Sequence, residues 1–121
     1  MIKTHARRKL GVLPAHRRMM LRQLATALLH HERLTTTEAK ARELVSYAGR
    51  MLGRLGRLSA PREHMRQAKR WLAPNGLGVE KKLIETLLPR LAGRKGGAIR
   101  MTRLPPRSSD QAKLARVDLV S

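Results

Sequence analysis

The sequence predicts an α+β fold with two layers, in which four helices pack against a small three-stranded mixed sheet. Three observations lead to this prediction. Apolar residues recur at the i, i+3, i+4, i+7 spacing of a helix in four separate segments. Three short segments are instead β-branched or alternate between apolar and polar residues, as strands do. Glycine and proline residues separate these segments, and the predicted order is α-β-α-α-α-β-β.

The 121-residue chain is predicted to form one domain, residues 15–121, preceded by a basic N-terminal arm, residues 1–14. The arm has no apolar period, so it is expected to be extended or disordered. A helix is predicted from Ala15 to His31, where leucine and alanine form an apolar stripe. The β-branched segment from Arg33 to Thr36 is predicted to be a strand.

The helix predicted next has the clearest apolar pattern in the chain. Thr37 is a suitable N-cap, and the pattern continues to about Leu55. Glu38 lies near the positive end of this helix and can pair with Arg42 one turn later. Gly56 marks the predicted end.

Two more helices are predicted after this point. Ser59 can cap the first of them, with Pro61 tolerated in its first turn. The second is predicted from Gly78 to Leu88, and Pro89 is expected to end it, because proline disrupts helical hydrogen bonding.

The last two predicted elements are strands. Residues from Ala98 to Leu104 and from Lys113 to Val120 alternate loosely between apolar and polar side chains. Pro105 to Asp110 is the predicted connection between them.

The charge of the chain predicts a polyanionic partner. It has 27 Lys and Arg residues against 8 Asp and Glu residues, for a net charge of +19. Such a charge repels itself unless a partner neutralises it, and nucleic acid does so with release of counterions. Arginine also outnumbers lysine, and its planar fork suits phosphate. Because basic residues run from Lys3 to Arg116, the folded body is expected to contact polyanion on several sides.

The near absence of aromatic residues bears on the kind of nucleic acid. Tyr47 and Trp71 are the only aromatics apart from histidine, and there is no Phe. This composition argues against binding of single strands on stacking platforms, and it favours duplex RNA.

Two other classes of protein are alternatives. A peripheral protein of anionic membranes would also be basic, but membrane-lying helices usually carry Trp or Phe on the apolar face. A basic DNA-compacting protein is the second alternative, because charge alone does not distinguish it from a protein that binds RNA. The sequence has no apolar run of membrane-spanning length, no pattern of a secretory signal and no Cys for a disulfide or thiolate metal site.

Several basic segments are candidate RNA contacts. In the loop of residues 93–97, glycine would let the backbone approach phosphate, or Gly96 and Gly97 would adopt a positive φ; a plain turn is the alternative. The start of the first helix and a four-residue stripe on the third are further candidates, with a solvated face as the alternative. The predicted RNA-binding residues are Lys3, His5, Arg7, Arg8, Lys9, His16, Arg17, Arg18, Arg22, Arg62, Arg66, Arg70, Arg94, Lys95, Gly96, Gly97 and Arg100.

Neither metal binding nor catalysis is predicted. Adjacent His30 and His31 point apart on a helix and lack metal-site spacing, so capping or RNA contact is favoured for them. There is no Cys nucleophile, and the scattered carboxylates sit beside Arg or Lys as ion-pair partners would.

Several motifs, taken together and in order, resemble a known family. They are Arg8-Lys9-Leu10, His16-Arg17, Arg22, His31-Glu32-Arg33-Leu34-Thr35-Thr36-Thr37, Lys40-Ala41-Arg42-Glu43-Leu44, Pro89-Arg90, Arg94, Gly96-Gly97 and Arg100. In this order they resemble the bacterial-type large-subunit ribosomal protein seventeen. Residues 66–72 and 107–113 look closer to mitochondrial members.

The resemblance implies an α-β-α(3)-β(2) two-layer fold without cofactor or catalysis. It implies a structural protein bound to large-subunit ribosomal RNA near the outer end of the polypeptide exit tunnel. The expected partners are that RNA and neighbouring large-subunit proteins, with no membrane, small-molecule substrate or homo-oligomer. A mitochondrial ribosome in the matrix is the favoured setting, with the bacterial cytoplasm and the plastid as alternatives.

Overall fold

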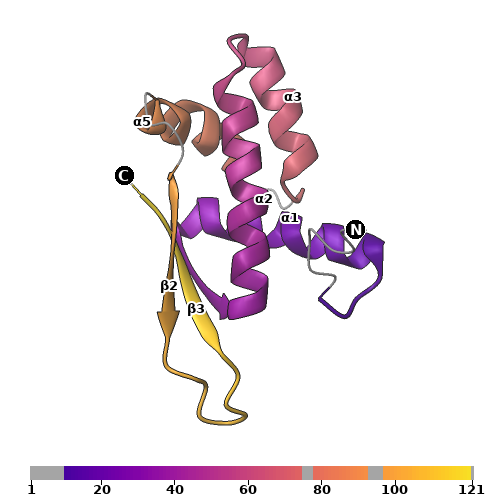
Figure 1. The fold of residues 1–121 in the computed structure, drawn as a ribbon. Coiled ribbons are helices and arrows are strands. Elements are labelled where there is room, and N and C mark those ends of the chain that lie inside the picture. The colour runs from indigo at the N-terminus through magenta and orange to yellow at the C-terminus, as the bar shows by residue number, and fades with distance from the viewer. Residues whose placement is uncertain (1–9, 75–77, 93–96, 121) are drawn as a thin grey trace, which may run out of the picture.

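The computed structural model describes residues 10–74, 78–92 and 97–120 (Figure 1). Its elements are α1 (Pro14–His31), β1 (Arg33–Thr37), α2 (Glu38–Gly56), α3 (Pro61–Trp71), α4 (Val79–Lys82), the π-helical turn η1 (Leu83–Leu87), α5 (Leu88–Leu91), β2 (Ile99–Leu104) and β3 (Leu114–Leu119). The α+β class and the predicted order of elements are confirmed, because α4, η1 and α5 follow one another without a break.

The sheet has the strand order β1-β3-β2, and both strand pairs are antiparallel. The prediction of a mixed sheet was therefore wrong. A short connection joins β2 to β3 and reverses the chain, which makes this pair antiparallel, whereas a parallel pair needs a long crossover. Strand β1 then pairs in the antiparallel sense with the other edge of β3.

One face of the sheet packs on the helices and forms the core. Val117 in the central strand is fully buried and lies opposite Leu34 on one side and Met101 on the other. Helix α2 stands at the centre of the molecule, with α3 folded back beside it (Figure 1). The predicted apolar stripe of α2 is confirmed, since these side chains are buried: Ala41, Leu44, Ala48, Met51, Leu52 and Leu55.

The helix after residue 78 differs from the prediction at its end. Pro89 does not end it, and the helical segment continues to Leu91. The reason lies in the π-helical turn before the proline, where the Leu88 N–H donates to the Leu83 carbonyl five residues earlier. In a regular α-helix the Pro89 ring would clash with the carbonyl four residues earlier, and proline has no N–H to donate to it. The wider π-helical turn makes room for the ring.

The helix starts show a second difference. Neither α2 nor α3 has a side-chain cap hydrogen bond, so Thr37 does not cap through its hydroxyl, and Ala60 takes the N-cap position expected for Ser59. The predicted pair at the start of α2 is confirmed, because Arg42 Nη2 donates to Glu38 Oε1 at 2.7 Å.

An ion pair closes the connection between β2 and β3. Arg107 binds Asp110 with two hydrogen bonds of 2.9 and 2.7 Å, and the Ala112 N–H donates to the same carboxylate. The Arg107 hydrogen bond is the main cause that lowers the pKa of Asp110 to about 2, and the Ala112 N–H adds to it.

This pair gives a pH-dependence prediction. Asp110 should titrate near pH 2 in a carbon-detected NMR titration, and Arg107→Ala should raise that pKa towards the ordinary value. The lowered pKa means that the pair supports the turn above the ordinary Asp pKa and is lost as the pH falls towards 2. Arg103→Ala, on the neighbouring strand, should leave the titration unchanged. An ordinary Asp110 midpoint in the unsubstituted protein would contradict the prediction.

Candidate nucleic-acid interface

The solvent-facing side of the sheet carries a group of arginines around one carboxylate. Arg33 in β1 and Arg100 in β2 both lie opposite Asp118 of the central strand, and Arg116 lies two residues before it. Because side chains alternate along strands, all four lie on the same face. We call Arg33, Arg100, Arg116 and Asp118 the sheet-face cluster.

Asp118 orients two of these arginines. Arg33 Nε donates to Asp118 Oδ1 at 3.1 Å, and Arg116 Nε donates to Oδ2 at 3.2 Å. The carboxylate is buried, whereas the Arg33 side chain is 67% exposed. With three guanidinium groups against one carboxylate, the cluster keeps a net positive charge, in a form suited to phosphate.

Sequence reasoning found only Arg100 of this cluster. Arg33 and Arg116 lie 83 positions apart in the sequence, and no local motif contains both. The available signal was the alternation within each predicted strand, which places Arg116 and Asp118 on one face. The pairing of β3 between β1 and β2, which brings the three arginines together, is not encoded in that alternation.

A second basic surface is the groove between α1, α2 and α3, which we call the helix groove. Arginines from all three helices line it together with the aromatic rings of Tyr47 and Trp71. Its lining residues are Ala15, Arg17, Arg18, Met19, Leu21, Arg22, Tyr47, Arg50, Arg54, Gln67, Arg70 and Trp71. The sequence prediction included Arg17, Arg18, Arg22 and Arg70, and it missed Arg50 and Arg54, which lie amid the apolar pattern of α2.

Two of the predicted contacts in this groove make bonds within the protein. Arg17 Nη2 pairs with Glu43 Oε2 of α2 at 2.9 Å. Arg22 donates from Nε and Nη2 to the Leu72 carbonyl, at 3.2 and 2.8 Å, and from Nη2 to the Lys69 carbonyl. These arginines therefore fix α1 to α2 and to the end of α3, and their contact with RNA stays a prediction.

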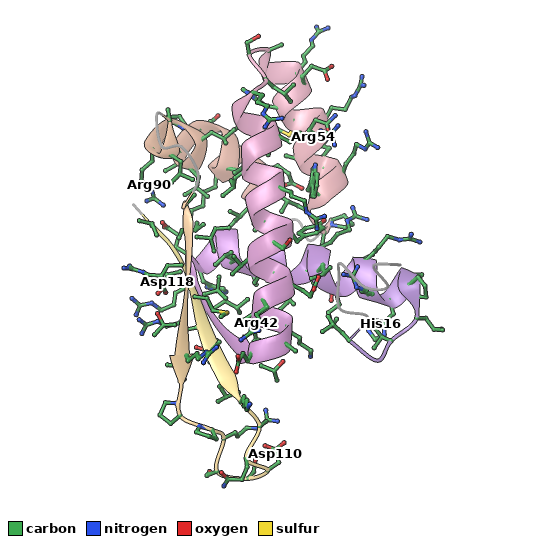
Figure 2. The ribbon with its side chains drawn as sticks, in the orientation of Figure 1. His16, Arg42, Arg54, Arg90, Asp110 and Asp118 are labelled. Carbon is green, nitrogen blue, oxygen red and sulfur yellow. The ribbon has the colours of Figure 1, made fainter. Side chains whose placement is uncertain are left out.

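The other predicted residues of the helices are exposed. His16 and Arg18 lie at the start of α1, and the stripe on α3 is also exposed, with Arg66 3.6 Å from Glu63. His16 and Asp118 lie on opposite sides of α2 in Figure 2. Basic groups thus occupy more than one side of the fold.

Glu32 joins the end of α1 to the helices that follow residue 78. Its backbone has a positive φ of 61°. Its carboxylate accepts a hydrogen bond from Arg90 and forms an ion pair with Lys82. The Arg90 hydrogen bond is the largest cause that lowers the pKa of Glu32, and Lys82 adds to it against the effect of burial. Lys82 also donates to the His30 carbonyl at 2.9 Å. The acidic residue of the His31-Glu32 motif therefore has a structural role.

Of the remaining predicted RNA contacts, only Gly97 lies within the described residues. Gly97 has a φ of +66°, which confirms the positive φ expected there. Arg94, Lys95 and Gly96 lie outside the described residues, as do the predicted contacts of the arm: Lys3, His5, Arg7, Arg8 and Lys9.

Within residues 10–74, 78–92 and 97–120, no three side chains of the metal-binding types gather in one place. The His30 and His31 rings lie edge to face, with centroids 4.6 Å apart. Of the helices in this part of the chain, none has both the length and the apolar character needed to cross a membrane.

Comparison with known proteins decides the family. A model of the family described as ribosomal protein L17 matches residues 20–120. The chain belongs to the ribosomal protein L17 family. Relatives named large ribosomal subunit protein bL17 include one from Desulfitobacterium hafniense, 42% identical over 117 residues, which cover 95% of this chain and 99% of the relative. Another, from Caldanaerobacter subterraneus, is 44% identical over 115 residues, or 93% and 97% of the two chains.

The L17 family also has a mitochondrial relative of this chain. Large ribosomal subunit protein bL17m of Schizosaccharomyces pombe is 38% identical over 125 aligned positions, which cover 99% of this chain and 58% of that protein. The family resemblance stated from the sequence is therefore confirmed, over nearly the whole length.

Proposed function

We propose that the protein is a structural constituent of the large ribosomal subunit and that it binds large-subunit ribosomal RNA. Membership of the L17 family supports the first part. The observation that carries the second part is the placement of exposed arginine on opposite sides of the fold, in a chain with a net charge of +19. A protein charged on several sides is stable in a compact form when RNA phosphates surround it.

The sheet-face cluster and the helix groove are the proposed contact surfaces. Arginine donates to two phosphate oxygens at once, and strands and helices hold it more rigidly than a loop would. The contacts predicted for the arm and for the loop of residues 93–97 would add to those of these two surfaces. Contacts to phosphate position a protein on RNA without reading its sequence.

This proposal predicts a strong salt dependence of RNA binding. The logarithm of the affinity for duplex RNA should fall linearly with the logarithm of salt concentration, by roughly 0.7–0.9 per phosphate contact and for several contacts in total. Filter binding or fluorescence anisotropy over a salt series measures the slope. Duplex RNA should bind more tightly than an unstructured strand of equal length, because the chain has few aromatic residues. A slope near zero would contradict the proposed mode of binding.

The native assembly tests the function itself. The protein should sediment with large ribosomal subunits, and this association should survive DNase and be lost with RNase. Loss with DNase would instead indicate a DNA-compacting protein. Recovery with vesicles of anionic lipid, unaffected by either nuclease, would indicate a membrane-surface protein.

The position in the subunit and the compartment are further parts of the proposal. The resemblance supports a place near the polypeptide exit tunnel rim, beside other large-subunit proteins. Because the chain has no Cys, a single Ser109→Cys variant would give one attachment site for a hydroxyl-radical probe that maps the nearby RNA. We propose the mitochondrial ribosome as the setting, which organelle fractionation tests against the bacterial cytoplasm and the plastid.

A further inference from the structure

We propose that the helix groove binds one unstacked nucleotide of RNA, with its base against Trp71 and its phosphates among the surrounding arginines. This inference rests on the proposed RNA-binding function and adds a defined subsite to it. The small number of aromatic residues argued against binding of single strands by stacking. The fold nevertheless brings Tyr47 and Trp71, the two aromatic residues apart from histidine, into one basic groove, where a single base could stack.

The Tyr47 and Trp71 rings of the groove pack against each other. The Tyr47 and Trp71 rings lie edge to face, with centroids 5.1 Å apart, and the Tyr47 hydroxyl donates to the Trp71 carbonyl at 2.6 Å. Both side chains are half-buried and both line the groove. The hydroxyl bond is made to the main chain and ties α2 to the end of α3, whereas the indole is positioned by its edge-to-face contact with the Tyr47 ring. Stacking a base on a tryptophan orders only two side-chain torsions, so its cost in conformational entropy is small.

The cationic side of the groove comes from three helices. Arg18 of α1, Arg54 of α2 and Arg70 of α3 are exposed and line it. Arg22 lines the same groove, and its guanidinium donates to the carbonyl of Leu72, the residue after Trp71. No Asp or Glu occurs among the described residues that form the lining, although Arg17 of the lining is paired with Glu43 of α2.

This combination matches the chemistry of a nucleotide. A free phosphate would use the arginines alone and leave the aromatic face unused. An acidic peptide would also satisfy the charge, but a flat base and its phosphate use both parts of the groove, and RNA presents such bases where a nucleotide leaves the stack. A base stacked on an aromatic side chain strengthens binding by about fivefold or more.

The test uses the full chain and three RNA hairpins. One hairpin is fully paired, the second has a single bulged adenosine, and the third has an abasic ribose at the bulge. Because Trp71 is the only tryptophan, its fluorescence reports on this groove alone. We expect the adenosine bulge to bind about fivefold or more tightly than the other two hairpins and to be the one that quenches Trp71 strongly.

Variants separate stacking from a structural role of the tryptophan. Trp71→Phe keeps an aromatic face and should keep the preference for the bulge, whereas Trp71→Leu should abolish it. Arg54→Ala, at an exposed position, should weaken binding of the bulged hairpin, and Lys81→Ala, an exposed cation outside the groove, should not. Circular dichroism confirms folding of each variant, and the abasic hairpin tests stacking on the unsubstituted protein.

The outcomes separate this inference from the proposed function. Equal affinity for the adenosine and abasic bulges, without a change in Trp71 emission, would overturn the nucleotide site while salt-dependent duplex binding still supported the function. Stronger quenching by an oligoglutamate peptide than by the bulge would overturn it in favour of a protein partner. Failure of all three hairpins to bind would overturn both proposals.

Discussion

Glu43→Ala should destabilise the protein by about 3 kcal/mol or more. The Glu43 carboxylate pairs with Arg17 at 2.9 Å across α1 and α2, and the two side chains are only 9% and 16% exposed. Removal of the carboxylate leaves a mostly buried guanidinium without this counter-charge. The penalty for such a group is larger than the net contribution of the pair when intact.

Chemical denaturation measures this effect against a matched control. Glu63→Ala removes the carboxylate of an exposed pair with Arg66, whose side chains are 42% and 72% exposed, and it should cost less than about 1 kcal/mol. Glu43→Gln, which keeps a hydrogen-bond acceptor, should lie between the two. Equal losses for Glu43→Ala and Glu63→Ala would show that burial of the first pair carries no special penalty.

The same pair explains why the role of Arg17 was not visible in the sequence. Its neighbours His16 and Arg18 are exposed, and all three were predicted as RNA contacts from one basic run. A helix turns each successive residue to a different side, so one member of the run faces α2. The identity of its partner, 26 positions away, depends on how α1 packs on α2.

The elements themselves were largely predictable because apolar periodicity reflects which side of a helix or strand is buried. The stripe of α2 and the pair of Glu38 with Arg42 follow from spacing within one helix. The sense of the sheet and the passage of the helix through Pro89 were not predictable in this way. The first depends on strand pairing between distant segments, and the second on a π-helical turn whose sequence has no distinctive spacing.

The same limit applies to the candidate sites. Local runs of charge indicated the start of α1 and the stripe on α3. The sheet-face cluster and the helix groove instead combine residues from three elements each, and isolated arginines such as Arg54 gain meaning only from the packing of those elements.

Loss of the sheet-face cluster should produce the second large effect, this time on RNA binding. In a variant with Arg33→Gln, Arg100→Gln and Arg116→Gln, Asp118→Asn is added so that no buried carboxylate is left without its partners. We expect affinity for duplex RNA to fall by about tenfold or more, and the salt slope to fall by roughly two to three, since each arginine that contacts a phosphate contributes about one.

The control for this variant is Asp118→Asn alone. It removes a negative charge from the cluster and keeps the three arginines, so RNA affinity should stay equal or rise, while stability falls because Arg33 and Arg116 lose their carboxylate. Opposite effects of the two variants on RNA affinity would show that the three arginines act by contact with phosphate and not only by supporting the sheet. An unchanged salt slope in the four-residue variant, with the fold retained, would mean that water rather than RNA phosphate surrounds these arginines in the complex.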